Sequence, residues 1–169
     1  NDAGIKSIIL TGEGKIFSSG GDLSTMKEMD AVSGRERLKI GHEIIHSITT
    51  LEKPIIAAIN GTAAGAGVSI SLACDMILAG RSAVLTQSFV KVGLIPDLGS
   101  IYFLPRLIGR HRAMELMFFG EKVSAEKARE IGIINKVVDY DLLLKEANVL
   151  AGKLAEAPNY AIGLIKRLI

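Results

Sequence analysis

The chain has 169 residues, of which 49% are hydrophobic and 22% are charged, and its formal net charge is +2. This length and apolar content predict one globular domain with a substantial core, whereas interspersed charges of both signs argue against a nucleic-acid partner. The single cysteine, Cys74, excludes an internal disulfide and a cysteine-rich metal site; because no apolar run is long enough to cross a bilayer either, we expect a cytoplasmic protein without a membrane partner.

The first third of the chain alternates apolar segments with helical patterns. Ser7–Thr11 predicts a strand, and Phe17–Gly21 predicts a loop that ends in a pair of glycines. A short helix is then expected over Asp22–Met29. After the breaker Ser33-Gly34, a second helix is expected to run to about Leu51, because its apolar residues fall on one stripe.

The most informative stretch is Ile55–Asp75. The five apolar residues Ile55–Ile59 follow a proline and predict a buried strand, and a glycine-rich turn then leads into a helix over Gly67–Cys74. The first N–H groups of such a helix lack partners inside it, so this end can hold an anion or a polarised carbonyl oxygen. The strand–glycine–helix pattern occurs a second time, in the strand Ser7–Thr11, the glycine pair that ends Phe17–Gly21 and the amphipathic run to Met29. Both units could therefore direct backbone donors at one point. The alternative is that the glycines only let a helix pack close to a strand.

The remaining chain shows strand and helix patterns without a repeat or linker, which predicts a single domain over 1–169. The expected strands are Met76–Ala79, Ala83–Thr86 and Asn135–Val138, with an irregular apolar segment over Gln87–Ile95. The expected helices are Leu98–Leu104, which Pro105 breaks or kinks, Arg110–Phe119, a helix that Ser124 caps and Gly132 ends, Tyr140–Glu156, and the segment from Asn159 onward. Because the chain starts in a turn and stops in mid-helix, we expect it to be truncated at both ends.

Several chemical signatures can be excluded. The dinucleotide fingerprint fails because Ile70 stands where its third glycine is needed, no Walker lysine follows a glycine loop, and a metal site is not indicated. One carboxylate remains, Asp97, which lies in a tight turn between Pro96 and Leu98. Burial among aliphatic groups would raise its pKa and let it transfer a proton near neutral pH. An aspartate between a proline and a helix is also a good N-cap, and this alternative stays open.

Five blocks of the sequence resemble the crotonase superfamily, the enoyl-CoA hydratase/isomerases. They are Phe17–Leu23, Lys53–Gly61, Ala64–Gly67, Ala73–Asp75 and Gly93–Gly99. The resemblance covers almost the whole chain and implies an α/β fold of the ClpP/crotonase type. This fold is a superhelix of β-β-α units whose helical C-terminal part, from about residue 110 onward, builds homotrimers or hexamers.

The resemblance also implies roles for individual residues. The N–H groups of Gly21 and Ala66 would form an oxyanion hole that stabilises the enolate of an acyl-CoA thioester, and Asp97 would be the general acid and base. The substrate-binding residues would be Phe17, Ser18, Ser19, Gly20, Asp22, Leu23, Ala64, Gly65 and Phe89. The acyl pocket would be lined by Met26, Met29, Phe89, Leu98 and Phe103, although for any one of these residues plain core packing is favoured over a role in the pocket. No cofactor is implied, since coenzyme A enters as part of the substrate.

Departures from the family pattern favour one reaction. Hydratases of the family use two glutamates, where this sequence has Ser69 and Phe89. Asp97 replaces a glycine of the hydratases and resembles the 1,2-epoxyphenylacetyl-CoA isomerase-like branch, so an acyl-CoA isomerase is predicted. The alternatives are an enoyl-CoA hydratase, a dehalogenase of the 4-chlorobenzoyl-CoA type with Asp97 as nucleophile and His42 as base, and a catalytically silent acyl-CoA-binding scaffold. His42 is itself expected at the edge of the inward face of its helix, partly buried.

Overall fold

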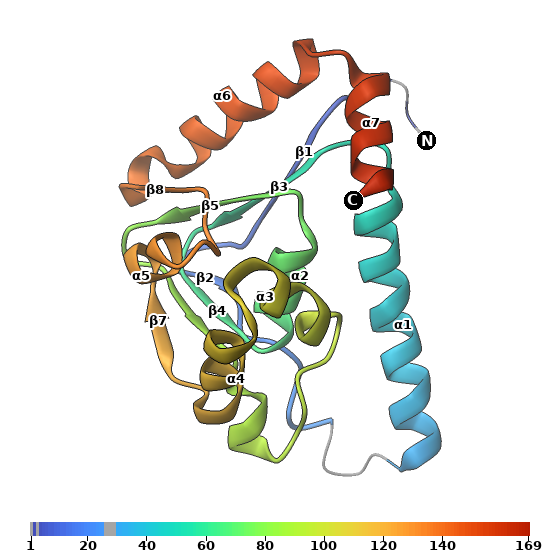
Figure 1. The fold of residues 1–169 in the computed structure, drawn as a ribbon, viewed down its shortest axis with the longest axis vertical. Coiled ribbons are helices and arrows are strands. Elements are labelled where there is room, and N and C mark those ends of the chain that lie inside the picture. Colours follow the sequence, from blue (N-terminus) through green and yellow to red (C-terminus); the bar gives the residue numbers. More distant parts are fainter. Residues whose placement is uncertain (1, 3, 26–29) are drawn as a thin grey trace.

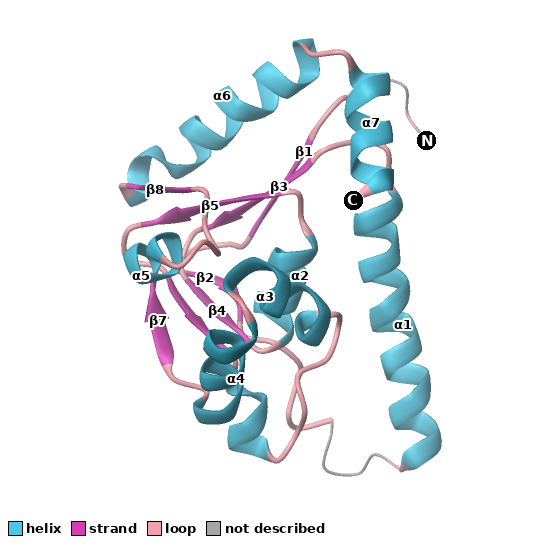
Figure 2. Ribbon diagram, in the orientation of Figure 1, coloured by secondary structure: helices cyan, strands magenta, loops and turns pink. Residues whose placement is uncertain are grey.

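Two four-stranded sheets form the centre of the molecule (Figures 1 and 2). The computed structural model describes residue 2 and residues 4–25 and 30–169. The first sheet has the order β1-β3-β5-β8 and is parallel throughout. The second has the order β2-β4-β6-β7, and its last pair is antiparallel. The strands are β1 Ile8–Thr11, β2 Ile16–Ser18, β3 Ile55–Ile59, β4 Thr62–Ala64, β5 Met76–Gly80, β6 Val84–Thr86, β7 Lys122–Ser124 and β8 Lys136–Val138.

The first six strands alternate between the two sheets, and a helix follows each of the first three strand pairs. The α-helices are α1 Ala31–Thr50, α2 Ala66–Ala73, α3 Ser100–Ile108, α4 Arg110–Phe119, α5 Ala125–Glu130, α6 Leu143–Glu156 and α7 Asn159–Leu168. Thus β1 and β2 precede α1, β3 and β4 precede α2, and β5 and β6 precede α3. The predicted α/β superhelix of β-β-α units is confirmed, and the C-terminal part is mainly helical, as expected.

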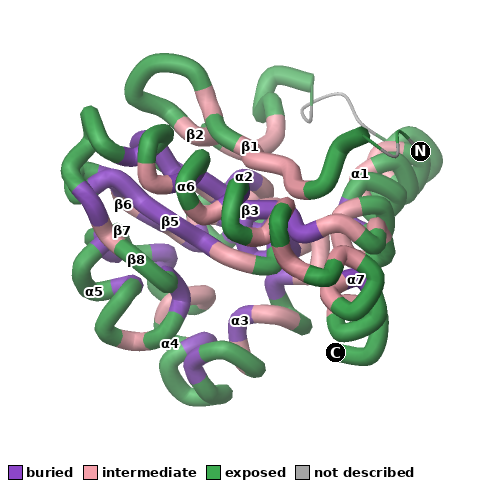
Figure 3. The backbone as a smooth tube through the Cα atoms, turned by 90° about the horizontal axis from the view of Figure 1, so that it is seen from above, coloured by how far each residue is buried: buried purple, intermediate pink, exposed green. Residues whose placement is uncertain are grey.

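The central strand β3 divides the core into two parts because successive side chains of a strand point to opposite faces. Ile55, Ala57 and Ile59 join the core that packs against α2 and α3. Ile56 and Ala58 point the other way, into a core that α6 covers with one face. All five residues of β3 are buried, and the central strands are the most deeply buried segments of the chain (Figure 3).

Some predicted elements differ from the observed ones. Helix α1 begins at Ala31, before the expected breaker, because the Asp30 side chain caps it by accepting a hydrogen bond from the Ser33 N–H at 2.8 Å. The expected helix over Asp22–Met29 is not formed at Asp22–Thr25, which make a turn, and its other residues lie outside the described ones. Pro105 does not end α3, which continues to Ile108.

The C-terminal helices lie at the side of the sheets. Helix α7 packs against the end of α1 and against Glu52 and Lys53, which precede β3, and α6 crosses the outer face of the first sheet (Figure 1). Among the described residues, none of the helices combines the length and apolar character needed to traverse a lipid bilayer.

Candidate active site

The turn before α2 presents backbone donors without acceptors. Gly65 has φ +49° and ψ −117°, which glycine adopts easily, and it precedes the first helical residue. The carbonyl of Gly65 accepts hydrogen bonds from the N–H groups of Val68 and Ser69. In the described part of the chain, no protein acceptor is found for the N–H groups of Ala66 and Gly67. The N-terminus of α2 therefore offers two free donors at the positive end of the helix dipole.

The first glycine loop lies directly against this turn. A methyl group placed on Gly20, whose φ is +92°, would lie 2.9 Å from the carbonyl oxygen of Ala64 and 3.5 Å from the nitrogen of Ala66. Likewise, a methyl group on Gly67 would lie 2.6 Å from the Cβ of Ser18. Since only glycine allows these approaches, the two loops are in contact because of their sequence. Gly21 follows in the first loop and is half-buried.

Asp97 lies in the loop that connects the 3-10 helix Ser88–Val92 with α3. The carboxyl group is half-buried, and its Oδ1 atom is inaccessible and has no hydrogen-bond partner among the residues that the structure describes. Burial raises the pKa of Asp97, while its own backbone, His42 and Arg37 lower it to a smaller extent. The alternative N-cap role is wrong: α3 begins at Ser100, its N-cap is Gly99, and no side chain caps it.

The loop of Asp97 is strained and held from two sides. Leu98 has φ +48°, the only positive φ of a non-glycine residue in the described chain. Its side chain packs on α1, where a methyl group on Gly41 would lie 2.5 Å from the Leu98 Cδ2 atom. On the other side, the Gln87 Nε2 donates to the Ser100 Oγ at 2.7 Å, and both side chains are buried. Ser100 in turn donates its N–H to the carbonyl of Asp97.

Phe89 connects this loop to the glycine turn, because its ring lies 3.6 Å from the position of a Gly65 Cβ. Phe89 is buried, and so is Ser69, whose hydroxyl donates to the Gly65 carbonyl at 3.4 Å. Neither residue can activate a water molecule: the phenyl ring has no polar group, and the Ser69 hydroxyl is already bonded and inaccessible. Among the other predicted residues, Phe103 is half-buried and packs on Gly99, whereas Met26 and Met29 lie outside the described residues.

The remaining predicted binding residues line the first loop. Phe17 and Ser18 belong to β2 and are half-buried, whereas Ser19, Asp22 and Leu23 are exposed. Hydrogen bonds from Ser24 lower the pKa of Asp22.

The exposure of His42 differs from the prediction. Its side chain is exposed rather than partly buried, and it lines a shallow hollow on the outer surface of α1. The reason is that the buried stripe of α1 is narrow, with Ile45 as its one buried residue.

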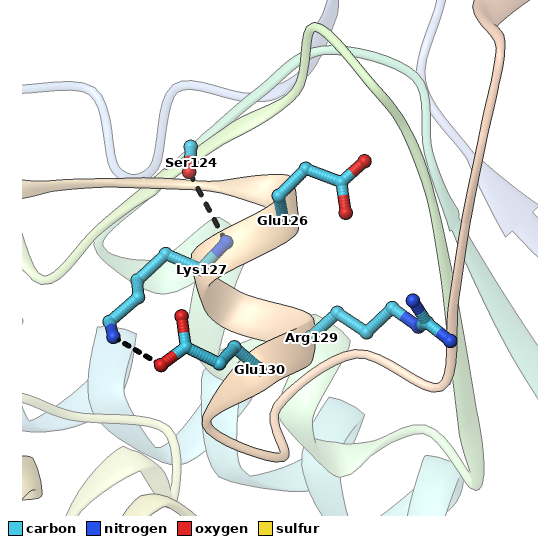
Figure 4. Close-up of a pocket in the computed structure, with 5 residues that line it drawn as sticks. All are labelled: Ser124, Glu126, Lys127, Arg129 and Glu130. Carbon is cyan, nitrogen blue, oxygen red and sulfur yellow. Dashed lines mark hydrogen bonds and ion pairs between the residues drawn. The ribbon is translucent and has the colours of Figure 1, made fainter.

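Other polar groups of the described chain are engaged elsewhere. The hollow beside α5 in Figure 4 is lined by charged side chains, but Lys127 is paired with Glu130 at 2.6 Å, and its backbone N–H is capped by Ser124. Burial raises the pKa of Cys74 to about 12, so its thiol stays protonated and is a poor nucleophile. No group of three possible metal ligands occurs among the described residues.

Sequence reasoning missed four residues that shape the site: Arg37, Gly41, Gln87 and Ser100. Each acts through a contact with a residue at least 12 positions away or on another element. Only the two polar residues inside apolar segments, Gln87 and Ser100, gave a signal, since a buried polar side chain needs a partner.

Comparisons with known proteins identify the family of the chain. The sequence profile described as Enoyl-CoA hydratase/isomerase matches residues 1–169. The chain is 41% identical to 1,2-epoxyphenylacetyl-CoA isomerase of Escherichia coli, over 99% of this chain and 66% of that protein. It is 36% identical to 4-chlorobenzoyl coenzyme A dehalogenase-1 of Arthrobacter, over 100% of this chain and 63% of that protein.

The fold is also similar to solved structures. The crystal structure of an enoyl-CoA hydratase from Bacillus anthracis superimposes with a TM-score of 0.94 at 38% identity, covering 98% of this chain and 65% of that one. The chain thus spans about two thirds of the length of the curated relatives that it matches.

Proposed function

The chain belongs to the enoyl-CoA hydratase/isomerase family, and from this premise we propose that it is the core of an acyl-CoA isomerase. The proposed reaction moves a double bond in, or rearranges, an acyl-CoA thioester through an enolate. Asp97 is the general acid and base, and the N–H groups of Gly21 and Ala66 bind the enolate oxygen. No cofactor takes part, because coenzyme A arrives as part of the thioester.

The observation that carries this proposal is the lone, half-buried carboxylate of Asp97. Its Oδ1 has no partner in the described protein, and burial raises its pKa toward the range in which a carboxyl group can both take and return a proton. Hydration in this family needs two carboxylates to activate and deliver water. The corresponding residues here are Ser69 and Phe89, which supports a reaction that needs only one.

A single carboxylate is sufficient for a double-bond shift. Asp97 removes a proton from C2 of a 3-enoyl-CoA, and the electron pair of that C–H bond moves into the thioester to give a dienolate. The oxygen of the dienolate accepts hydrogen bonds from the two backbone donors, each worth about 3 kcal/mol in the transition state. Asp97 then returns the proton to C4, and the 2-enoyl-CoA forms with no gain or loss of atoms.

The loops in contact at Gly20 and Ala64 supply the proposed binding surface. Phe17, Ser18, Ser19, Asp22 and Leu23 on one side face the thioester and the pantetheine arm. Gly65 and Phe89 belong to the other side. This assignment is supported by the close approach of the two loops around Gly20, which leaves no room for a side chain between them.

The test is the substitution Asp97→Asn in the full-length protein. We expect wild-type protein to convert 3-enoyl-CoA to 2-enoyl-CoA and to hydrate 2-enoyl-CoA poorly. D97N should lose isomerisation by a factor of about 10³ or more, while isothermal titration with a non-reacting acyl-CoA shows nearly unchanged binding. Retained turnover in D97N removes Asp97 from the mechanism, and efficient hydration by the wild type favours the hydratase instead.

The dehalogenase is the second candidate, because His42 is close enough to Asp97 to lower the pKa of its carboxyl group. Against it, His42 is exposed and no hydrogen bond joins it to Asp97 among the described residues. Release of chloride from 4-chlorobenzoyl-CoA distinguishes the two reactions, with His42→Gln as the control. A silent scaffold would bind these thioesters and convert none of them.

A further inference from the structure

An arginine on α1 contacts the turn that follows the proposed oxyanion donor Gly21. The Arg37 Nη1 donates to the Thr25 Oγ1 at 2.7 Å. The same Thr25 hydroxyl donates to the carbonyl oxygen of Asp22 at 2.8 Å. A guanidinium on α1 is thereby connected, through one hydroxyl, to the residue next to Gly21.

The turn itself is already ordered by local hydrogen bonds. The Asp22 Oδ1 accepts from the Ser24 N–H at 2.9 Å and from the Ser24 hydroxyl at 2.7 Å. These bonds, with a smaller effect of Arg37, lower the pKa of Asp22. The turn is therefore held together by its own hydrogen bonds, and the bond from Arg37 to Thr25 joins it to α1.

The same stretch of α1 also holds the loop of Asp97. One turn after Arg37, Gly41 lets the Leu98 side chain pack directly on the helix. His42 and Arg37, both on α1, lower the pKa of Asp97 slightly against the larger effect of burial. Arg37 thus contacts the turn after Gly21 and belongs to the stretch of α1 on which the loop of Asp97 packs.

We propose that Arg37 is a positioning residue that fastens the turn after Gly21 to α1 and adds its positive charge on the stretch of α1 that holds the loop of Asp97. It thereby fixes the spacing between the oxyanion loop and the base. This inference rests on the proposed function of the same site. Arginine suits the task because its planar group stays charged and donates in fixed directions, which a lysine does less well. The spacing matters because a displacement of about 1 Å can lower a rate by as much as 100-fold.

Three variants of the full-length protein separate the effect of the hydrogen bond to Thr25, called the tether, from the effect of the positive charge. R37M removes both the tether and the charge, R37K keeps the charge, and Thr25→Val keeps the charge and removes the tether. Arg35→Met is the matched control, since Arg35 is exposed on the same helix and lines only its outer surface.

With a 3-enoyl-CoA as substrate, we expect R37M and T25V to lower kcat about tenfold while KM changes less than about threefold. In R37M the acid limb of the kcat/KM profile should also move to higher pH, because Asp97 loses an attractive charge and needs a higher pH to ionise. The limb should stay in place in T25V, R37K and R35M. Unchanged kcat in both R37M and T25V overturns the tether, and an unmoved limb in R37M overturns the charge.

A readout without turnover keeps this test separate from the proposed reaction. Carboxyl ¹³C NMR titration of the full-length protein, with D97N to assign the resonance, gives the pKa of Asp97 directly. A higher pKa in R37M than in R35M supports the charge effect even if no isomerase activity is found, and equal values overturn it. If circular dichroism shows that R37M does not fold, the same comparison is made with R37K, T25V and Arg37→Gln. The proposal is overturned if the acid limb of the kcat/KM profile, or the titration of the Asp97 resonance, is the same in Arg37→Gln as in wild type.

Discussion

At the scale of single residues, the site concentrates features that a stable protein ordinarily avoids. Asp97 holds a carboxylate oxygen inaccessible and without a protein partner in the described chain. The next residue, Leu98, adopts a left-handed backbone conformation that costs a non-glycine residue about 1–2 kcal/mol. Such strain persists only where surrounding contacts enforce it. Here the packing of Leu98 on Gly41 and the bond from Gln87 to Ser100 do so.

This arrangement predicts that Asp97 weakens the fold at neutral pH. The pKa of Asp97 is raised in the folded state. Its favourable contribution to the free energy of unfolding is therefore complete below the pKa of the unfolded chain, about 3.9, and is lost as the pH rises through the higher pKa of the folded protein. Asp97→Asn should therefore melt about 1–2 °C higher than wild type at pH 7, a small gain because the group is partly solvated. The difference should disappear near pH 3.5.

Thermal melts of wild type and D97N from pH 3.5 to 7.5 measure this difference in Tm. Asp22→Asn is the control of opposite sign: the pKa of Asp22 is lowered, so its contribution is present at neutral pH and lost on acidification. A Tm difference between D97N and wild type that is the same at every pH contradicts the prediction.

The candidate site could be predicted from the sequence only where its residues carry a local signal. Gly20 stands out because a glycine pair follows a strand, and Asp97 because a carboxylate interrupts an apolar turn. Arg37 has no such signal, since its partner Thr25 is 12 residues earlier and the intervening fold brings them together. The orientation of α1 likewise decided the exposure of His42, which helical periodicity alone placed incorrectly.

At the scale of elements, strand prediction depended on apolar content. β1, β3 and β5 were predicted because each is a continuous apolar run. β2, β4 and β7 have three residues each, and several of these are small or polar, so nothing local distinguishes them from loops. They form because neighbouring strands of the second sheet provide hydrogen-bond partners. Helix α3 continues past Pro105 for a related reason: Leu104 and Ile108, on either side of the proline, pack in the core and maintain the helix.

Helix α7 is held to the first sheet by an ion pair between a buried lysine side chain and a partly exposed aspartate. The Lys166 Nζ donates to the Asp75 Oδ2 at 2.7 Å and to the carbonyl of Lys53 at 3.0 Å. The Lys166 side chain is only 7% exposed. The same Asp75 oxygen accepts the N–H of Ile55, the first residue of β3, so one carboxylate connects the C-terminal helix with the central strand.

We predict that Lys166→Met destabilises the protein by about 1–2 kcal/mol, because Asp75, whose side chain is 27% exposed, loses the cation of a partly buried pair. Arg167→Met is the matched control on the same helix: its pair with Glu52 is exposed, so the loss should be below about 1 kcal/mol. Urea unfolding measures both values. In the double variant K166M/D75N, the loss should be smaller than the sum of the single losses. Equal effects of K166M and R167M would show that the Lys166–Asp75 pair contributes no more to the free energy of unfolding than the exposed pair does.

At the scale of the whole molecule, many apolar side chains remain on the surface. One group defines an η1–α4 surface, formed by Val90 and Val92 of the 3-10 helix η1 (Ser88–Val92) and by Phe118 and Phe119 at the end of α4. The two elements touch here, since a methyl group on Gly120 would lie 3.3 Å from the Val90 Cγ1. Phe118 and Phe119 are 60% and 65% exposed. Clustered apolar side chains of this kind are typical of surfaces that another chain covers.

We therefore predict that the full-length protein is a homotrimer or a pair of trimers whose subunits meet over the η1–α4 surface. Phe119→Lys should reduce the mass measured by sedimentation to that of a smaller species, because a charge in an apolar interface must be desolvated without a partner. Tyr160→Lys on α7 is the control, being 77% exposed and outside this surface, and it should leave the mass unchanged. A wild-type protein that sediments as a monomer contradicts the assembly itself. If Y160K dissociates the protein while F119K does not, the interface lies on α7 and the η1–α4 surface must be covered by a different part of the full-length chain.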